Sequence, residues 1–242
     1  MPVLFKDDIL SLQNSIARLT ITEALELLHR SYPQAITFST SFSYEDQVIT
    51  HFIAQSKFNI DIFSLDTGRL FPETYSTWMR TLEQFGLPIR SLHPDETDIG
   101  NFVSNNGPNA FYESVDLRKQ CCYIRKVAPL KKALLGKRVW ITGLRAQHSP
   151  DRNDFQILEW DETNQVIKYN PLLHWTTGEV RQYIDEHKIP YNSLHDKGFI
   201  SIGCAPCTRA VKEGEDFRAG RWWWEDASKK ECGLHVHQTI TK

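Results

Sequence analysis

Hydrophobic and polar residues along this chain follow two alternating patterns. Short runs rich in β-branched and aromatic residues predict strands at 35–39, 60–65, 87–92 and 138–142. The segments between these runs repeat apolar residues every three or four positions, which predicts amphipathic helices. Because the strands alternate with helices, we expect an α/β fold with a mainly parallel sheet and helices on both faces.

Helix starts are marked by local capping patterns. Thr20 is followed three residues later by Glu23, and Thr176 by Glu179, and both spacings are typical of a capping box at a helix N-terminus. The first box, together with an amphipathic segment before it, predicts two helices within residues 1–30. We expect these two helices to form an N-terminal helical cover.

Two segments depart from the simple alternation of strands and helices. Residues 155–160 and 165–169 alternate between apolar and polar positions around a polar turn, which predicts a hairpin. We expect this hairpin to be an irregular addition to the sheet. Residues 116–136 predict a helix that breaks near Pro129, because proline lacks the amide proton that an interior helical position donates.

Composition limits the class of protein. With 242 residues, of which 40% are hydrophobic, the chain can bury one full core, so a single domain is the default. The net charge of -2 argues against a nucleic-acid-binding or membrane-binding surface. The N-terminus lacks a basic region followed by an apolar run, and no later stretch has the length of a membrane span. We therefore expect a cytoplasmic protein.

Five cysteines give the strongest chemical signal. Cys121 and Cys122 are adjacent, Cys204 and Cys207 form a C-x-x-C motif, and Cys232 has no internal partner. In a reducing cytoplasm such thiols are typical of metal-binding or catalytic sites. Four cysteines usually bind zinc as two C-x-x-C knuckles, which an adjacent pair does not form. An iron–sulfur cluster presents several iron atoms, so adjacent cysteines can bind different irons, and a cluster is the better interpretation.

Simpler interpretations exist for each part of this pattern. Free cysteines are often buried as small hydrophobic residues, which would explain the adjacent pair alone. The C-x-x-C motif would suit a thioredoxin-like redox pair, but it follows a loop rather than a strand. Basic residues crowd the region 118–152, which indicates a local anion site. Among them, Lys126 lies four residues after Cys122 and would share its helical face.

Two polar turns follow predicted strands. The first, at 39–46, is rich in hydroxyl groups and precedes a helix, whose N-terminus can stabilise an anion. An ordinary serine N-cap is the simpler alternative for this turn. The second, at 65–69, ends the next strand, and open α/β sheets bind ligands at the carboxyl ends of their strands.

Taken together, these features resemble one family. The resemblance is carried by the cysteine set, the turn Ser39–Asp46, the motif Leu65-Asp66-Thr67-Gly68-Arg69-Leu70, the motif Arg218-Ala219-Gly220-Arg221-Trp222-Trp223-Trp224 and the motif Glu231-Cys232-Gly233-Leu234-His235. Over nearly the whole chain after the N-terminal helices, the sequence resembles the bacterial assimilatory adenylyl-sulfate (APS) reductases, which depend on thioredoxin and carry a 4Fe-4S cluster. The resemblance implies an adenine nucleotide α-hydrolase-like fold. It also implies one domain with three parts, namely the helical cover 1–30, a nucleotide- and cluster-binding α/β part 31–215 and a flexible catalytic tail 216–242.

The resemblance further implies roles for single residues. Cys121, Cys122, Cys204 and Cys207 would hold the cluster, and Cys232 would be the catalytic nucleophile. The implied substrate-binding residues are Ser39, Ser41, Phe42, Ser43, Leu65, Asp66, Gly68, Arg69, Lys126, Gly143, Arg152, Arg218, Arg221 and His235. The members of this group that would meet the sulfate and phosphate are Lys126, Arg218, Arg221 and His235. The segment from Gly143 to Arg152 would be the arginine loop of the family.

The implied reaction follows from these roles of the five cysteines, four of which would hold the cluster while Cys232 stays free to react. The Cys232 thiolate attacks the sulfur of the sulfate–phosphate anhydride, AMP leaves, and a Cys232 S-sulfonate remains. Because the other four cysteines are occupied, sulfite release needs an external dithiol protein such as thioredoxin or glutaredoxin. Neither nucleic acid nor a membrane is an expected partner. The sequence leaves open the oligomeric state, including a homo-oligomer, and the use of the 3′-phosphorylated nucleotide.

Two functions from other classes compete with this reading. A cluster-bearing, ATP-dependent tRNA thiolation enzyme would share the fold type. It would need a turn of the form Ser-Gly-Gly-x-Asp-Ser, where this chain has Ser-Phe-Ser-Tyr-Glu-Asp at 41–46, and a broader basic surface. A non-enzymatic iron–sulfur sensor that binds a nucleotide would leave Cys232 without a task.

Overall fold

A computed structural model describes residues 4–148 and 155–226, and the side chains of 9–147 and 155–226. The chain divides into two compact units that interleave along the sequence. The first, here called the sheet unit, comprises Met1–Ser64, Pro72–Arg90 and Gly136–Ser193. The second, here called the cysteine unit, comprises Leu65–Phe71, Ser91–Leu135 and Leu194–Lys242.

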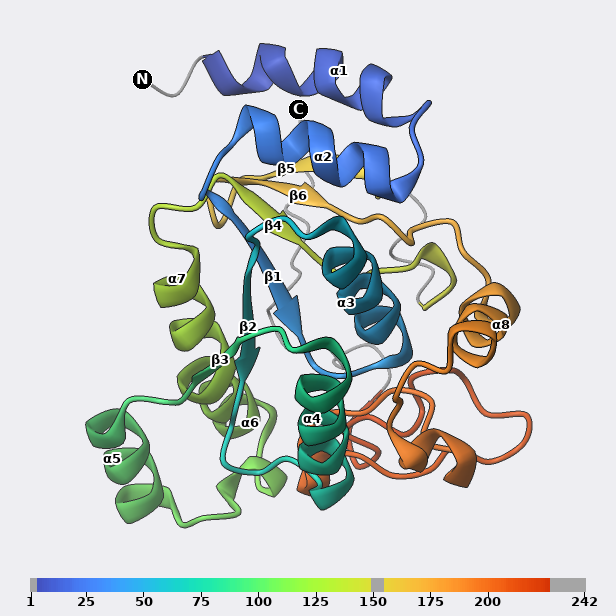
Figure 1. Cartoon of the computed structure of the whole chain (residues 1–242). Coiled ribbons are helices and arrows are strands. Elements are labelled where there is room, and N and C mark those ends of the chain that lie inside the picture. The colour runs from blue at the N-terminus through green and yellow to red at the C-terminus, as the bar shows by residue number, and fades with distance from the viewer. Residues whose placement is uncertain (1–3, 149–154, 227–242) are drawn as a thin grey trace. The chain divides into compact units, whose positions relative to one another are not determined.

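Among the described residues, six strands form one sheet in the order β3-β2-β1-β4-β6-β5 (Figure 1). The strands are β1 (Ile36–Thr40), β2 (Asp61–Leu65), β3 (Ile89–Leu92), β4 (Val139–Ile141), β5 (Leu158–Asp161) and β6 (Val166–Tyr169). Strand β1 pairs in parallel with β2 and β4, and β4 pairs in parallel with β6, whereas β5 and β6 are antiparallel. The mainly parallel sheet predicted from the sequence is confirmed.

The helices of the sheet unit gather around α3. They are α1 (Leu4–Ile16), α2 (Ile21–Ser31), α3 (Tyr44–Ser56), α4 (Pro72–Phe85) and α8 (Thr177–His187), with a 3-10 turn at Ala146–His148. Helix α3 contacts α2, α4 and α8 as well as β1 (Figure 1). The predicted capping boxes are confirmed, because Thr20 with Glu23 begins α2 and Thr176 with Glu179 begins α8.

The main hydrophobic core of the sheet unit lies between the strands and α3. Every second residue of a strand faces this core, and α3 supplies the opposing side chains. The central members, each at most 2% exposed, are Ile36, Phe38, Ile62, Val139, Ile141, Val48, Ile49 and Ile53. Full burial of one such side chain stabilises a fold by about 1.5–3 kcal/mol, so this core holds the polar turn between β1 and α3 in place.

The predicted hairpin is confirmed, but it is not an irregular addition. Strand β6 pairs in parallel with β4 through Val139↔Ile167 and Ile141↔Tyr169, and β5 pairs with β6 at the edge. The hairpin therefore extends the main sheet by two strands. A periodicity within one segment does not reveal this pairing, because it joins residues far apart in the sequence.

The cysteine unit contains helices α5 (Glu96–Asn106), α6 (Val115–Cys122) and α7 (Ala128–Leu134), with short helical turns at Ala110–Tyr112 and Ala205–Cys207. A further turn, Ser193–Lys197, lies at its boundary. A π-helical turn, Tyr123–Val127, joins α6 to α7. The helix predicted for 116–136 therefore changes at this turn and not at Pro129. That proline follows the π-helical turn by two residues, and the helical backbone runs through both without a gap.

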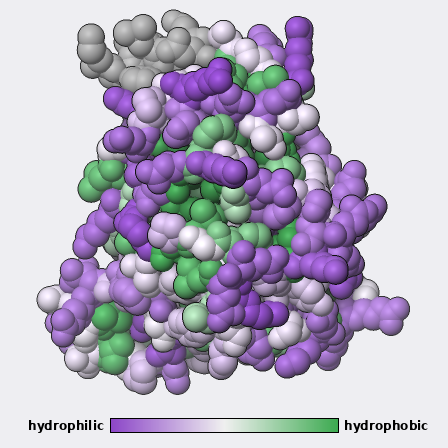
Figure 2. Space-filling model, in the orientation of Figure 1, coloured by the Kyte–Doolittle hydropathy of each residue, from purple (hydrophilic) through white to green (hydrophobic). Residues whose placement is uncertain are grey.

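Within residues 4–148 and 155–226, no helix is long and apolar enough to cross a membrane. On the face drawn in Figure 2, hydrophilic side chains make up most of the surface, and apolar side chains gather toward its centre.

Candidate functional site

Four cysteines of the cysteine unit lie around one cavity. Cys121 and Cys122 end α6, while Cys204 caps the turn Ala205–Cys207 and Cys207 ends it. Each of the four is a free thiol and is 8% exposed. The empty space at this site is ≈ 300 Å³ when the solvent at its open side is included. Its lining residues are the four cysteines with Arg69, Phe111, Arg118, Arg125, Lys126 and Pro206.

Local backbone geometry directs both cysteine pairs into this cavity. The α-helical backbone ends at Cys122, and the wider π-helical turn that follows changes the direction of the next side chains. In the second pair, the Cys207 N–H donates to the Cys204 carbonyl at 2.9 Å, which makes a tight turn. In the part of the chain that the structure describes, no group of three or more His, Cys, Asp or Glu side chains could hold a single metal ion.

Four cationic side chains line the same cavity: Arg69, Arg118, Arg125 and Lys126. The predicted cation beside the cysteines, Lys126, is confirmed. Arg118 and Arg125 belong to the basic region noted in the sequence, but they were not placed beside the cysteines, although each lies four residues from one, Cys122 and Cys121 respectively. This spacing of four residues is a signal that would have found both arginines.

The four thiols differ in acidity because their surroundings differ. Burial opposes ionisation of Cys204, but Lys126 and a hydrogen bond with the Thr67 hydroxyl at 3.3 Å favour it, and its pKa is lowered. Burial, followed by the neighbouring sulfur atoms, raises the pKa of Cys207 to about 12. Burial also raises the pKa of Cys121, against the opposing charge of Arg125. A group that binds all four sulfur atoms as thiolates must therefore displace protons.

Three buried N–H groups near the cysteines have no hydrogen-bond partner among the described residues. They are Nε of Arg125, Nε of Arg221 and Nε1 of Trp222. Arg125 lines the cavity, Arg221 acts electrostatically on Cys204, and Trp222 packs in the same hydrophobic cluster as the four cysteines. A buried donor without a partner costs about 1–3 kcal/mol, so these groups indicate space for an acceptor that residues 4–148 and 155–226 do not supply.

The predicted residues Arg218 and Arg221 surround one buried ring. The guanidinium carbons of Arg221 and Arg218 lie 4.7 Å and 6.0 Å from the centroid of the Trp222 ring. A side chain at Gly203 would place its Cβ only 2.4 Å from Nη2 of Arg221, so glycine is required there for this arginine to fit. Trp222 itself has a positive φ of 40°, which a residue with a large side chain rarely adopts.

The predicted turn at 65–69 belongs to the cysteine unit and shapes one side of the cavity. Asp66 accepts a hydrogen bond from the Gly68 N–H at 2.8 Å, and Gly68 has a positive φ of 68°. Arg69 donates to Asn109 at 3.1 Å, and its carbonyl accepts from the Ala205 N–H at 2.8 Å. The turn that holds the C-x-x-C motif is therefore fixed to the turn that follows β2.

The predicted hydroxyl-rich turn lies between β1 and α3 in the sheet unit. Ser43 is the N-cap of α3, so the simpler interpretation is confirmed for that serine. The hydroxyl of Ser39 accepts from Trp140 Nε1 at 2.9 Å. Phe42 has a positive φ of 59°, is fully buried and stacks on Trp78 with ring centroids 5.1 Å apart. Three of the four predicted residues of this turn, Ser39, Phe42 and Ser43, thus have clear structural tasks.

Two acidic residues at the start of α3 were not singled out from the sequence. Asp46 accepts hydrogen bonds from the backbone and the hydroxyl of Ser41 at 2.6 Å and 2.7 Å. Burial raises the pKa of Asp46 to about 6 despite these bonds. A side chain at the predicted residue Gly143 would place its Cβ 2.3 Å from Asp46 Oδ1, so glycine is required for this close approach.

Arg145 connects the other acidic residue to neighbouring segments. It is 2% exposed and forms an ion pair with Glu45 at 2.7 Å. Its remaining N–H groups donate to Gln147 at 2.9 Å and to Thr177 at 3.1 Å. The start of α3, the segment after β4 and the start of α8 are thereby held together within the sheet unit.

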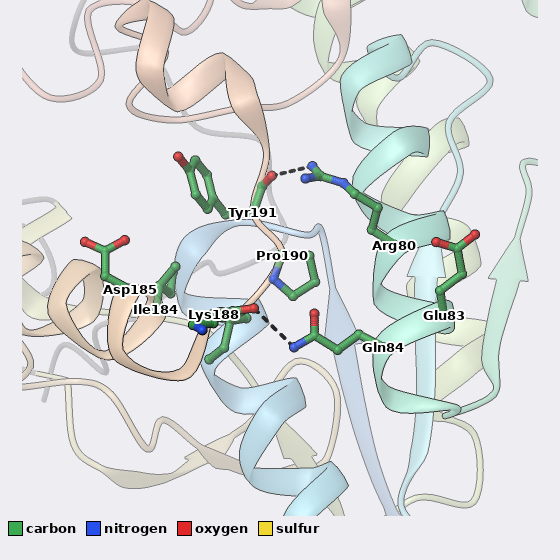
Figure 3. Close-up of a pocket in the computed structure, with 9 residues that line it drawn as sticks. Arg80, Glu83, Gln84, Ile184, Asp185, Lys188, Pro190 and Tyr191 are labelled. Carbon is green, nitrogen blue, oxygen red and sulfur yellow. Dashed lines mark hydrogen bonds between the residues drawn. The ribbon is translucent and has the colours of Figure 1, made fainter.

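Three predicted site residues lie outside the described residues: Arg152, Cys232 and His235. A separate groove of the sheet unit, between α4 and the end of α8, is lined by none of the predicted residues (Figure 3). There Arg80 donates to the Tyr191 carbonyl at 2.7 Å and Gln84 to the Lys188 carbonyl at 3.2 Å. These bonds tie α4 to the segment after α8, and we assign them a structural role.

Known proteins resemble this chain at the level of both sequence and fold. Residues 35–210 match the family model of the phosphoadenosine phosphosulfate reductase domain. The chain is 48% identical to the adenosine 5′-phosphosulfate reductase of Burkholderia cepacia over 85% of this chain and 82% of the relative. It is 46% identical to the protein of the same name from Agrobacterium fabrum over 95% of this chain and 88% of the relative.

Among solved structures, the phosphoadenylyl-sulfate (PAPS) reductase of Candida auris in a phosphate complex matches with a TM-score of 0.71 and 27% identity, covering 84% of this chain and 96% of that chain. An FMN adenylyltransferase of Candida glabrata shares the fold alone. It is 14% identical with a TM-score of 0.54, and the match covers 98% of this chain and 77% of that chain. From the family model and the close relatives together, we conclude that this chain belongs to the phosphoadenosine phosphosulfate reductase domain family and, within it, to the adenosine 5′-phosphosulfate reductases.

Proposed function

We propose that this protein reduces adenylyl sulfate to sulfite and AMP in assimilatory sulfate reduction. The observation that carries the proposal is the grouping of four buried free thiols with cationic side chains around one cavity. This grouping assigns Cys121, Cys122, Cys204 and Cys207 to a common task and leaves Cys232 as the thiol available for chemistry. The names of the relatives, which are adenosine 5′-phosphosulfate reductases, support the choice of substrate.

The cavity suits a 4Fe-4S cluster by the chemistry of its lining. Four cysteines would hold the four iron atoms. Four cations would balance the negative charge of the cluster, and the buried N–H groups of Arg125, Arg221 and Trp222 would donate to its sulfur atoms. When bound, the cluster would supply a fixed negative charge that shapes the electrostatic field of the site, because the electrons of the reaction arrive through thiol exchange.

The first chemical step is assigned to Cys232. Its thiolate attacks the sulfur of the sulfate–phosphate anhydride, the bond from that sulfur to the bridging oxygen breaks, and AMP leaves with the electron pair. The product on the protein is a Cys232 S-sulfonate. Lys126, Arg218, Arg221 and His235 are proposed to neutralise the sulfate and phosphate as the thiolate approaches. The cationic lining around Lys126 and the buried Arg221 support two of these roles.

The nucleotide part of the substrate is assigned to residues in each of the two units. In the sheet unit these are Ser39, Ser41, Phe42, Ser43 and Gly143, with Arg152 of the arginine loop. Because the Phe42 side chain is fully buried, its backbone is the group that it would present. In the cysteine unit the proposed residues are Leu65, Asp66, Gly68 and Arg69.

The second step needs an external dithiol. One thiolate of thioredoxin, or of a glutaredoxin, attacks Sγ of Cys232, and sulfite leaves with the electron pair of the sulfur–sulfur bond. The second thiol of the reductant resolves the mixed disulfide, so the two electrons that reduce the sulfur come from the dithiol. This chemistry requires reduced thiols, which agrees with the cytoplasmic location expected from the sequence.

The direct test is to incubate the protein, purified without oxygen, with sulfur-labelled adenylyl sulfate in the absence of any reductant. We expect one labelled sulfonate per chain, located on Cys232 by mass spectrometry, and one AMP released. Thioredoxin added afterwards should release labelled sulfite. A Cys232→Ser variant is the control and should form no adduct. Sulfite release at the full rate by that variant would contradict the proposal and favour the nucleotide sensor instead.

A further inference from the structure

A buried ion pair joins the cysteine helix to the C-terminal segment of the cysteine unit. Arg118 Nε donates to Glu225 Oε1 at 2.9 Å, and Arg118 Nη2 donates to Glu225 Oε2 at 2.7 Å. The two residues are 107 positions apart in the sequence. Their side chains are 0% and 3% exposed. The pair is therefore bidentate and almost fully removed from solvent.

Arg118 also contacts two further groups that matter for the site. Its guanidinium carbon lies 4.7 Å from the centroid of the Trp222 ring. The same side chain lines the cysteine cavity together with Cys122. Arg118 precedes Cys122 by one turn of α6. One side chain thus contacts both the cysteine helix and the segment 222–225.

Backbone contacts hold the same segment against the second cysteine pair. The Trp222 N–H donates to the Cys207 carbonyl at 3.1 Å, and the Glu225 N–H donates to the Trp222 carbonyl at 2.9 Å. Trp222 is 1% exposed and belongs to the same hydrophobic cluster as the four cavity cysteines. The segment 222–225 is consequently attached to both parts of the cysteine set.

A buried ion pair holds two segments together at a high cost in desolvation free energy. Removing two charges from water costs several kcal/mol per ion, and a hydrophobic pair of the same size is often at least as stable. What a bidentate ion pair adds is a defined geometry between the two groups. Here the ion pair fixes the position of Glu225, which lies seven residues before Cys232.

We propose that Arg118 is a positioning residue, which acts through Glu225 on the reach of Cys232. An extended chain spans at most about 3.6 Å per residue, so attachment at Glu225 keeps Cys232 within about 25 Å of that point. A tether of this length raises the effective concentration of the thiol at its target and restricts its direction of approach. The inference rests on the proposed function, because it assumes that Cys232 is the reacting thiol.

The test compares Glu225→Gln and Arg118→Lys with a matched control, Glu215→Gln. The first two variants keep a polar group but lose the charge of the carboxylate or the fork of the guanidinium. The control removes a second bidentate pair of the same unit, between Arg209 and Glu215, whose side chains are 32% and 29% exposed. Three quantities are measured for each protein: iron and sulfide content, the rate of Cys232 sulfonation in a single turnover, and hydrogen exchange of the peptides covering 226–231.

We expect the two Arg118–Glu225 variants to keep wild-type iron and sulfide content while the sulfonation rate falls about tenfold or more. The KM for adenylyl sulfate should change by less than about twofold, because neither residue binds substrate. Exchange of 226–231 should become faster. The double variant should be no slower than the slower single variant, since both changes remove the same contact. Glu215→Gln should match the wild type in every measurement.

Two results would overturn the inference. One is wild-type sulfonation together with wild-type exchange in both Arg118–Glu225 variants. The other is a loss of rate that follows a loss of iron and sulfide in equal proportion, because that result assigns the pair to holding the cysteine set alone. Failure of the proposed function looks different, since the wild-type protein would then form no Cys232 adduct. The exchange of 226–231 would still report whether Arg118 holds this segment.

Discussion

Both units bury charged groups, but the arginines beside Cys121 and Cys204 differ from the acidic residues at the start of α3 in their hydrogen bonding. In the sheet unit, Asp46 accepts two hydrogen bonds from one serine, and Glu45 is paired with Arg145. In the cysteine unit, Nε of Arg125 and Nε of Arg221 are buried and have no hydrogen-bond partner among the described residues. The first arrangement is satisfied within the sheet unit, whereas the second leaves two donors without an acceptor in the part of the chain that the structure describes. The hydrogen bonds at the start of α3 keep that turn in shape, whereas the donors beside the cysteines are consistent with the proposed cluster.

The largest effect is expected from a variant that removes one of the four cysteines of the cavity. A Cys207→Ser variant replaces a soft thiolate with a hydroxyl, which is a poor ligand for iron. We expect bound iron and sulfide to fall at least about tenfold, with loss of the visible absorption of the cluster and of reductase activity. Iron and sulfide assays on protein prepared without oxygen measure this. A Cys207→Ser protein with a full complement of both elements would refute the assignment of this cysteine.

The next effect concerns the buried carboxylate of the sheet unit. The pKa of Asp46 rises from 3.8 to about 6 on folding, so between these pH values the folded protein binds more protons than the unfolded chain. The free energy of unfolding should therefore fall as pH rises through this window, by about 3 kcal/mol in total, and stay level above it. An Asp46→Asn variant should lack this component.

Urea denaturation of both proteins at about pH 5 and about pH 7.5 measures the difference, which should exceed about 1 kcal/mol. Iron and sulfide content serves as the control, because the change lies in the other unit and should leave the cysteine cavity intact. If wild type and variant lose the same stability between the two pH values, Asp46 is ordinarily ionised in the folded state.

A smaller effect tests the close approach at Gly143. A Gly143→Ala variant places a methyl group 2.3 Å from Asp46 Oδ1, so the turn must shift. We expect a loss of about 2 kcal/mol in the free energy of unfolding, as for other overpacked sites. Gly178→Ala is the matched control, because its nearest neighbour would lie at an ordinary 3.8 Å. Equal stability of the two variants would mean that the segment around Gly143 can shift without a loss in the free energy of unfolding.

Local patterns predicted local structure well. The capping boxes at Thr20 and Thr176 needed only a spacing of three residues, and both begin helices. The place of the hairpin beside β4 was not predicted, because strand order depends on pairing between distant segments. The π-helical turn at Tyr123–Val127 was not predicted, because its apolar spacing resembles that of an ordinary helix. The break was expected near Pro129, two residues after this turn, because proline interrupts helical hydrogen bonding.

The sequence predicted many residues of the candidate site but not the contacts between them. The grouping of Cys121 with Cys204 follows from their chemistry, because a pair of thiols in each segment suggests a shared ligand. The contact of Arg118 with Glu225 spans 107 positions and has no pattern in the sequence. Glu45 looked like part of a serine-rich turn, and only the fold brings Arg145 to it. Long-range charge pairs of this kind require the tertiary structure.

The interleaving of the two units along the chain has a consequence for biosynthesis. Cys122 leaves the ribosome 82 residues before Cys204. At a synthesis rate of about 5–20 residues per second, the first two thiols wait about 4–16 s for the other two. During that interval the nascent polypeptide carries a vicinal dithiol without its partners. A ligand that needs all four thiols can bind only once translation has passed Cys207, so the proposed cluster would be inserted at the end of synthesis or after release.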